Sequence, residues 1–298
     1  MFINRLIVCG AVITLLLASV SCKSKFEQIR TSNNIAQKYQ EAIKYYENGK
    51  YSRALILFDD LTKRYRGQAE AEDLYYYVAY TNYRLKDYTS ARYHFQDFVE
   101  YYANSPRAEE CRFMAAYCFY LEAPRASLDQ EYTYRAIESL QLFLNIYPES
   151  ERAEEASNLI QELRDRLEAK AFANAKLYLD MGLMDDYRAA VIAFDNALRD
   201  YPDTKYAEEM EFLSVKAQYL YASNSTLRRQ EERYNQMMDM YTSFVNAYPE
   251  SKFLKEANDL KKQAEQGLKE AKKNMELYQA AIAEQEKREQ NRNKNIED

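Results

Sequence analysis

The side chains that could carry out catalysis are few and lie apart in the sequence. His94 is the only histidine in the 298 residues, and it lies between Tyr93 and Phe95 in an expected helix. A catalytic base must lie within hydrogen-bonding reach of the proton that it removes. No serine or cysteine nucleophile occurs in a recognisable context, and no glycine-rich loop suits a phosphate. The sequence therefore predicts a protein that is not an enzyme and needs no cofactor.

Cysteines and carboxylates do not predict a metal site either. Cys111 and Cys118 are seven residues apart on one expected helix, so their Cα atoms lie about 10 Å apart, too far for a disulfide. We interpret them as buried core residues. Adjacent carboxylates such as Asp59–Asp60 and Glu109–Glu110 project about 100° apart on a helix. We interpret these pairs as solvated faces or helix caps, and we expect no bound metal.

Tyrosine is the abundant side chain with binding chemistry: the chain has 29 tyrosines and no tryptophan. Tyrosine rings give apolar contact, and their hydroxyls can reach the backbone groups of an extended peptide. Arg84 follows Tyr83 and is suited to a terminal carboxylate. The candidate peptide-binding groove consists of Tyr39, Tyr46, Tyr76, Tyr80, Tyr83, Arg84, Tyr117 and Tyr120. The alternative is that these aromatic residues pack between adjacent helices.

The candidate residues belong to a repeat of 37 residues. The small residues Ala42, Ala79 and Ala116 keep this spacing, and so do aromatic residues before and after them. Self-similarity at this period is typical of stacked helical hairpins. The low content of five glycines and five prolines also favours helices over strands. In such a stack, one face of the first helices lines the concave side, which is where we expect the tyrosines.

The repeat continues with changes beyond residue 120. The third unit carries about eight extra residues in the turn between its helices, where a stack tolerates insertions. "YPES" at 147–150, "YPDT" at 201–204 and "YPES" at 248–251 then mark ends of units, because proline ends a helix and Ser or Thr can cap the next one. The sequence thus predicts an all-α solenoid of about five helix pairs plus a C-terminal helix.

We expect the chain to divide into an N-terminal half, a C-terminal half and a tail. The N-terminal half, residues 35–148, holds the first three units and the groove. The C-terminal half, residues 149–267, holds the last two. Residues 268–298 form a charged helical tail, whose last part has almost no apolar face and should fray.

The N-terminus has the features of an export signal. An apolar run from Leu6 to Val20 follows one basic residue, and it is shorter than a membrane span needs. "LASVSC" ends at Cys22, which resembles a bacterial lipoprotein signal, although Ser19 stands where many such signals have leucine. This resemblance implies a signal peptide at 1–21, acylation of Cys22 and a polar, aperiodic tether at 22–34. The alternative is an ordinary secretory signal with a coincidental cysteine.

The repeats resemble tetratricopeptide repeats through the pattern of small, aromatic and "YP" positions, with Lys86 departing where the first unit has Gly49. The lipoprotein signal, the insertion ending in "DQEYTYRAIESL" and the block "LRDYPDTKYAEEM" together resemble the BamD family over about residues 19–250. The resemblance implies a lipid-anchored scaffold of the outer-membrane β-barrel assembly complex, on the periplasmic face of the outer membrane.

The same resemblance implies two protein partners. The C-terminal half would bind the periplasmic domains of a BamA-type barrel protein, and the N-terminal half would receive unfolded outer-membrane protein precursors. The net charge of −6 argues against nucleic acid. The alternative function is a lipid-anchored adaptor for another cell-envelope process, such as peptidoglycan coordination.

Overall fold

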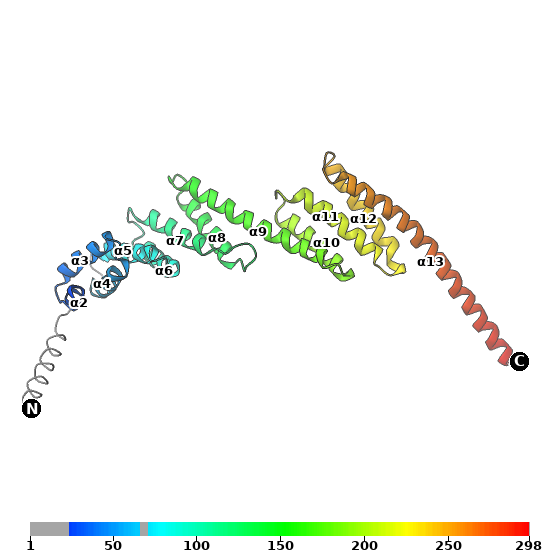
Figure 1. Cartoon of the computed structure of the whole chain (residues 1–298), viewed down its shortest axis with the longest axis horizontal. Helices are drawn as coiled ribbons and strands as arrows, with labels where there is room; N and C mark the ends of the chain where they lie inside the picture. The colour runs from blue at the N-terminus through cyan, green and yellow to red at the C-terminus, as the bar shows by residue number, and fades with distance from the viewer. Residues whose placement is uncertain (1–23, 66–70, 298) are drawn as a thin grey trace, which may run out of the picture. The chain divides into compact units, whose positions relative to one another are not determined.

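Helices account for all regular secondary structure in the computed structural model, which describes residues 24–65 and 71–297, with side chains as far as residue 290. Within these ranges there is no strand, so the predicted all-α fold is confirmed (Figure 1). The helices are α2 (Lys25–Arg30), α3 (Ile35–Glu47), α4 (Tyr51–Tyr65), α5 (Ala71–Arg84), α6 (Tyr88–Tyr101), α7 (Ala108–Glu122), α8 (Glu131–Ile146), α9 (Ala153–Met181), α10 (Met184–Asp200), α11 (Ala207–Ser223), α12 (Leu227–Ala247) and α13 (Leu254–Glu297).

The helices fall into two compact units. Unit 1 comprises Met1–Pro124 and Leu128–Leu163, and unit 2 comprises Arg125–Ser127 and Arg164–Asp298. Consecutive helices pack against one another from α3 to α8 in unit 1 and from α10 to α13 in unit 2. This is the successive pairing expected of a helical-repeat solenoid.

Each pair closes around a fully buried small residue. Ala42 and Ala54 are completely buried in the first pair, as are Ala79 and Ala91 in the second. The large residues four positions after the small residue of the second helix, Phe58, Phe95, Leu140 and Phe194, are also completely buried. Small residues let two helices approach closely, and the large side chain fills the space beside them. The register predicted from the 37-residue period is therefore the register of the core.

The short turns between paired helices need a left-handed residue. Gly49 has φ of 69° in the turn after α3, and Lys86 has φ of 63° at the equivalent position after α5. After each turn the chain enters the next helix. Asp87 caps α6 by accepting a hydrogen bond from the Ser90 amide at 3.0 Å. The departure at Lys86 thus leaves the turn geometry unchanged but places a side chain where glycine is favoured.

A recurring clamp joins each first helix to the next one. The hydroxyls of Ser105 and Ser150 each donate at 2.6 Å to a glutamate near the start of the preceding first helix, and the hydroxyl of Thr204 donates at 2.9 Å to Glu168 in the middle of α9. The residue two positions after the Ser or Thr places its side chain on an aromatic ring of the preceding first helix. That ring lies four positions after the glutamate. These pairs are Arg107 on Tyr76, Arg152 on Phe113, Tyr206 on Phe172 and Phe253 on Phe212.

The predicted capping role of Ser150, Thr204 and Ser251 is not confirmed: the N-cap of α11 is Tyr206, which makes no side-chain cap hydrogen bond, and the same holds for Arg107 at the start of α7. The hydroxyl oxygens of Ser105, Ser150, Thr204 and Ser251 accept the backbone N–H two residues on, at 3.0 to 3.3 Å. Each of these residues therefore shapes the turn that precedes a helix, three residues before the helix begins, and three of them also tie this turn to the preceding first helix.

Two segments differ in detail from the sequence-based expectation. Within the expected tether at 22–34, residues 25–30 form α2, whose Ile29 is buried and whose Phe26 ring lies 5.6 Å from Tyr45. Helix α13 remains helical to Glu297, and i,i+4 pairs such as Arg288–Glu284 support it. Fraying of its end stays a prediction.

The expected signal peptide at 1–21 and the acylated Cys22 lie outside the described residues. Among the residues that are described, no helix combines the length and apolar character needed to cross a membrane.

Candidate peptide-binding face

Three neighbouring first helices carry the eight candidate residues. Tyr39 and Tyr46 lie on α3, Tyr76, Tyr80, Tyr83 and Arg84 on α5, and Tyr117 and Tyr120 on α7. Every one of the seven tyrosines is half-buried, and Arg84 is exposed. We call these eight residues the tyrosine face.

Glu110 of α7 joins two of these tyrosines across the repeat boundary. Tyr76 donates its hydroxyl to Glu110 Oε2 at 3.1 Å, and Tyr80 donates to Glu110 Oε1. The two rings lie 4.7 Å apart, and the Tyr80 ring meets the buried Phe95 edge-on at 5.0 Å. Both hydroxyls are thus fixed donors, and the rings form a rigid centre of the face.

Burial and the Glu110 charge keep both hydroxyls protonated. Burial raises the pKa of Tyr76 to about 12, and the neighbouring Glu110 adds to the rise. Burial raises the pKa of Tyr80 well above its ordinary value, and its hydrogen bond to Glu110 acts in the same direction. The guanidinium of Arg107 covers the Tyr76 ring, with Cζ 4.6 Å from the ring centre, and pairs with Asp73 at 2.5 Å.

The α3 tyrosines meet α5 at two points. The Arg84 guanidinium faces the Tyr46 hydroxyl, and this interaction raises the pKa of Arg84. The Tyr46 ring also packs edge-on against Tyr77 at 5.3 Å. Tyr39 lies nearer the start of α3. Burial raises the pKa of its hydroxyl, and the charge of Asp73 adds to the rise.

On α7 the aromatic residues form a stack. Phe113, Tyr117 and Tyr120 follow one another with ring distances of 5.9 and 5.6 Å and nearly parallel planes. The Tyr120 hydroxyl donates to Glu162 of α9 at 2.8 Å. Tyr83 of α5 lies near enough to Tyr117 for burial and that neighbour to raise the pKa of Tyr83.

The tyrosine face therefore has two properties at once. Its rings pack between helices, as the alternative interpretation held, and each ring also keeps part of its surface open. Rings fixed by neighbours lose little conformational entropy when they meet a ligand. A face of this kind is suited to contact an extended chain without rearranging.

Sequence reasoning missed Glu110 and Arg107. Glu110 was interpreted with Glu109 as part of a solvated face, but both carboxylates are half-buried and hydrogen-bonded, Glu109 to Ser150. The usable signal was the shared motif in which Arg107 and Arg152 each follow a serine by two residues and precede "AEE". A hollow of about 630 Å³ lies beside Glu110, and Arg152, Tyr147 and Pro148 also line it.

Burial shifts the pKa values of the histidine and the two cysteines that were considered for chemistry. Burial raises the pKa values of Cys111 and Cys118 to about 12, so both thiols stay protonated at neutral pH. Burial lowers the pKa of His94. Among the described residues, no group of three or more His, Cys, Asp or Glu side chains could hold a metal ion.

The fold and the tyrosine face define a helical-repeat protein built to present an aromatic surface. A family model described as YfiO, outer membrane lipoprotein, matches residues 31–224. This match covers most of the repeats, so the chain belongs to this family of BamD-type outer membrane lipoproteins. No curated protein matches the chain. Helix α13 lies beyond the matched residues.

Proposed function

We propose that the protein is a lipid-anchored scaffold for the assembly of outer-membrane β-barrel proteins, and that its tyrosine face binds unfolded precursors. Family membership supports the setting. The observation that carries the proposal is the row of half-buried tyrosines along α3, α5 and α7, with Arg84 exposed at one end of α5.

A precursor segment would lie across these helices in an extended form. Open ring surface would cover its apolar side chains, and exposed Arg84 would take a carboxylate at its end. The hydroxyls of Tyr76 and Tyr80 already donate to Glu110, so backbone groups of the segment would turn to the other tyrosines. The role is binding and positioning, and we propose no enzymatic step.

We place the second partner on the C-terminal half, residues 149–267. The periplasmic domains of a BamA-type barrel protein would bind there, while acylated Cys22 holds the chain to the periplasmic face of the outer membrane. Several acyl chains would anchor the protein firmly, at roughly 0.8 kcal/mol for each buried methylene.

Site-specific photocrosslinking tests the binding of precursors. A photoreactive phenylalanine analogue replaces Tyr80 or Tyr83, and a peptide with the aromatic C-terminal segment of an outer-membrane precursor is added. We expect adducts at both positions. The matched control is Tyr93 on α6, whose side chain is 59% exposed and lies outside the tyrosine face. Adducts at Tyr93 with none at Tyr80 and Tyr83 would refute the proposed face.

Co-purification tests the partner. A tagged full-length chain extracted from membranes should bring down a BamA-type barrel. Recovery of murein enzymes without that barrel would instead support the peptidoglycan alternative.

A further inference from the structure

A hollow of the same kind recurs on the second-helix side of three repeats. In each, two second helices form the walls and the first helix between them forms the floor. The walls are α4 and α6 around α5, α6 and α8 around α7, and α10 and α12 around α11. None of the three includes a residue of the tyrosine face, so this surface goes beyond the function proposed above.

The fifth residue of the floor helix differs among the three hollows, and so do its contacts. Tyr75 of α5 packs against Tyr101 and Tyr102 with ring distances of 5.7 and 5.8 Å. Glu211 of α11 accepts a hydrogen bond from the Tyr248 hydroxyl at 3.1 Å. Arg112 of α7 is the exception, because its Nε is shielded from solvent and has no hydrogen-bond partner among the described residues. Leaving such a buried donor unpaired costs free energy.

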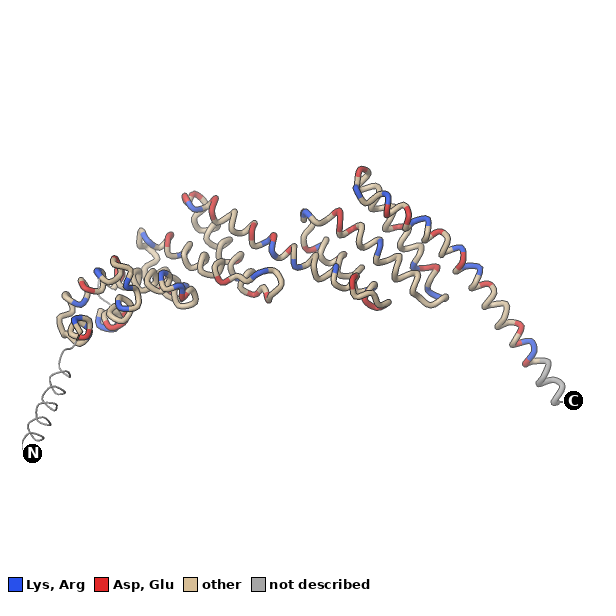
Figure 2. The backbone as a smooth tube through the Cα atoms, in the orientation of Figure 1, with Lys and Arg blue, Asp and Glu red and all other residues tan. Residues whose placement is uncertain are grey.

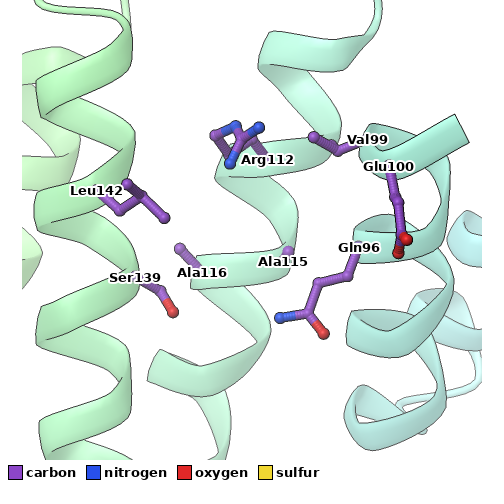
Figure 3. Close-up of a pocket in the computed structure, with 8 residues that line it drawn as sticks. All are labelled: Gln96, Val99, Glu100, Arg112, Ala115, Ala116, Ser139 and Leu142. Atoms are coloured by element: carbon purple, nitrogen blue, oxygen red, sulfur yellow. The ribbon is translucent and has the colours of Figure 1, made fainter. Parts of the chain in front are cut away.

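The surroundings of Arg112 combine an apolar floor with polar walls. Figure 3 shows Arg112 above Ala115 and Ala116 on α7, with Leu142 and Ser139 on one side and Gln96 and Glu100 on the other. The two alanines are buried and leave room above them, and the Leu142 side chain is 49% exposed. Ile146, one turn farther along α8, is 44% exposed. Apolar surface therefore lies next to a guanidinium whose Nε is unpaired.

The size of the hollow limits the ligand. Its volume of about 260 Å³ is below the usual range for small-molecule sites, but it admits one or two side chains. Leu142 and Ala116 would cover an apolar side chain, and Arg112 would hold a carboxylate near it. The hydroxyl of Ser139 and the amide of Gln96 can reach polar groups beside them.

The charges favour a protein carboxylate over a phosphate. Arg112 is the one cation among the lining residues, and Glu100 lines the same hollow. A phosphate with up to two negative charges would be repelled by Glu100, and a membrane surface would need several cations. A single carboxylate matches the fork of one guanidinium.

We propose that the hollow over α7, between α6 and α8, binds an acidic segment of a partner protein, with its carboxylate on Arg112 and an adjacent apolar side chain on Ala115, Ala116 and Leu142. A helical segment suits the position, because it places Glu and an apolar residue one turn apart on one face. The carboxylate is that of a side chain, so the segment need not end there.

The absence of tryptophan from the chain gives a direct assay. The probe is an N-acetylated, C-amidated helical peptide with Glu residues one turn on either side of a single Trp, whose fluorescence reports binding to the full-length protein without background. We expect an emission change on titration. The matched probe with Gln in place of Glu should bind about tenfold more weakly, since a hydrogen bond to a charged group is lost.

Two variants connect the binding to this hollow. Arg112→Gln should weaken the Glu peptide about tenfold and leave the Gln peptide unchanged, while its melting temperature stays the same or rises because a buried unpaired Nε is removed. Leu142→Asp should weaken both peptides, since it removes the apolar contact to the tryptophan, and it should weaken the Glu peptide further because it adds a like charge. Tyr80→Phe, on the tyrosine face, should leave both peptides unaffected.

The outcomes that would overturn the proposal are specific. Equal binding of the Glu and Gln peptides, or full binding to Arg112→Gln, would remove Arg112 from recognition. Vesicles containing phosphatidylglycerol, or inorganic phosphate, that displace the Glu peptide at concentrations where it binds would show a phosphate site instead. Because the peptide has no free carboxyl terminus and Tyr80→Phe is included, failure here leaves the precursor-binding face separately testable.

Discussion

Lys38 shows how a charge can be buried in a repeat core. Its side chain is only 2% exposed, and its ammonium pairs with Asp60 of α4, whose side chain is 36% exposed. The pairing with Lys38 lowers the pKa of Asp60, and Arg64 adds to this at 3.5 Å. The buried ammonium of Lys38 therefore depends on the pair for its counter-charge, whereas the carboxylate of Asp60 can also reach water.

We expect Asp60→Asn to cost more stability than Lys38→Met. Asp60→Asn leaves a buried ammonium without its counter-charge, which should cost about 1–3 kcal/mol after allowance for the partly exposed carboxylate. Lys38→Met removes the buried charge and leaves Asp60 with water and Arg64, so its effect should be under about 1 kcal/mol. Urea denaturation followed by circular dichroism measures both. The reverse order would contradict the interpretation of Lys38 as the dependent partner.

The lone histidine makes a prediction about pH. Burial lowers the pKa of His94 below its ordinary 6.5. The charges of Asp97, Asp59 and Asp87 act in the opposite direction but do not outweigh burial. Below that ordinary value the unfolded chain therefore binds this proton more readily than the folded one does, so acidification destabilises the fold. Burial raises the pKa of Asp59, which acts in the opposite direction at lower pH.

His94→Gln should accordingly lose less stability on acidification than the parent chain does. The measurement is the shift in melting temperature from pH 7 to about 5.5, above the range where most carboxylates titrate. Identical shifts in the two proteins would show that the pKa of His94 is the same in the folded and the unfolded chain.

At the scale of elements, the two equivalent turns allow a matched comparison. Lys86→Gly should stabilise the protein by about 0.5–1 kcal/mol, because φ of 63° strains a residue with a Cβ. Gly49→Ala should destabilise it by about 1 kcal/mol, since no atom lies within 4 Å of the added Cβ and only the φ of 69° opposes it. Thermal denaturation of both variants tests the pair. A loss of stability in Lys86→Gly would mean that the lysine side chain contributes contacts that outweigh its strain.

Element positions were predictable because the core repeats. Ala54 and Ala91, or Phe58 and Phe95, recur at one spacing and are equally buried, so their pattern carries the fold. The contacts of Glu110 were not predictable, because its tyrosine partners lie 30 and 34 residues away and the sequence pattern gives no distance between faces. Helix α2 was missed because six residues are too few to show a period.

The candidate site was only partly predictable for a similar reason. The spacing brought the tyrosines to neighbouring helices, but burial of each ring depends on what stands opposite, such as Phe95 against Tyr80. The hollow at Arg112 had no signal at all, since Tyr75, Arg112 and Glu211 share a position but no chemistry. Such a site becomes visible only when the partners of each residue are known.

At the scale of the whole molecule, α13 packs on α12 in the position of a first helix in unit 2. Its early residues Ala257, Ala264 and Ala271 are buried, and Phe253 stacks on Phe212 at 4.6 Å. Gly267 fits because a Cβ there would come within 2.6 Å of the Tyr234 ring. Farther along, Leu277 is 60% exposed, and charges of both signs follow one another along the helix (Figure 2).

This division predicts opposite effects for two truncations. Removing residues 279–298 should leave the melting temperature unchanged, because the described side chains in that range are exposed and the last contact toward α12 is that of Tyr278 with Arg228. Removing residues 252–298 strips Phe253, Leu260 and Ala264 from the core around Phe244, so unit 2 should lose cooperative unfolding. Thermal circular dichroism and limited proteolysis of unit 2 distinguish the cases.

Gly267→Ala tests the same docking with a single change. The added methyl must displace the Tyr234 ring, at a cost of about 1–3 kcal/mol, whereas alanine in place of glycine in a free helix gains about 1 kcal/mol. The clash should win, and the melting temperature should fall. A rise would mean that α13 already stands away from α12 at this point, and the long truncation should then be nearly as harmless as the short one.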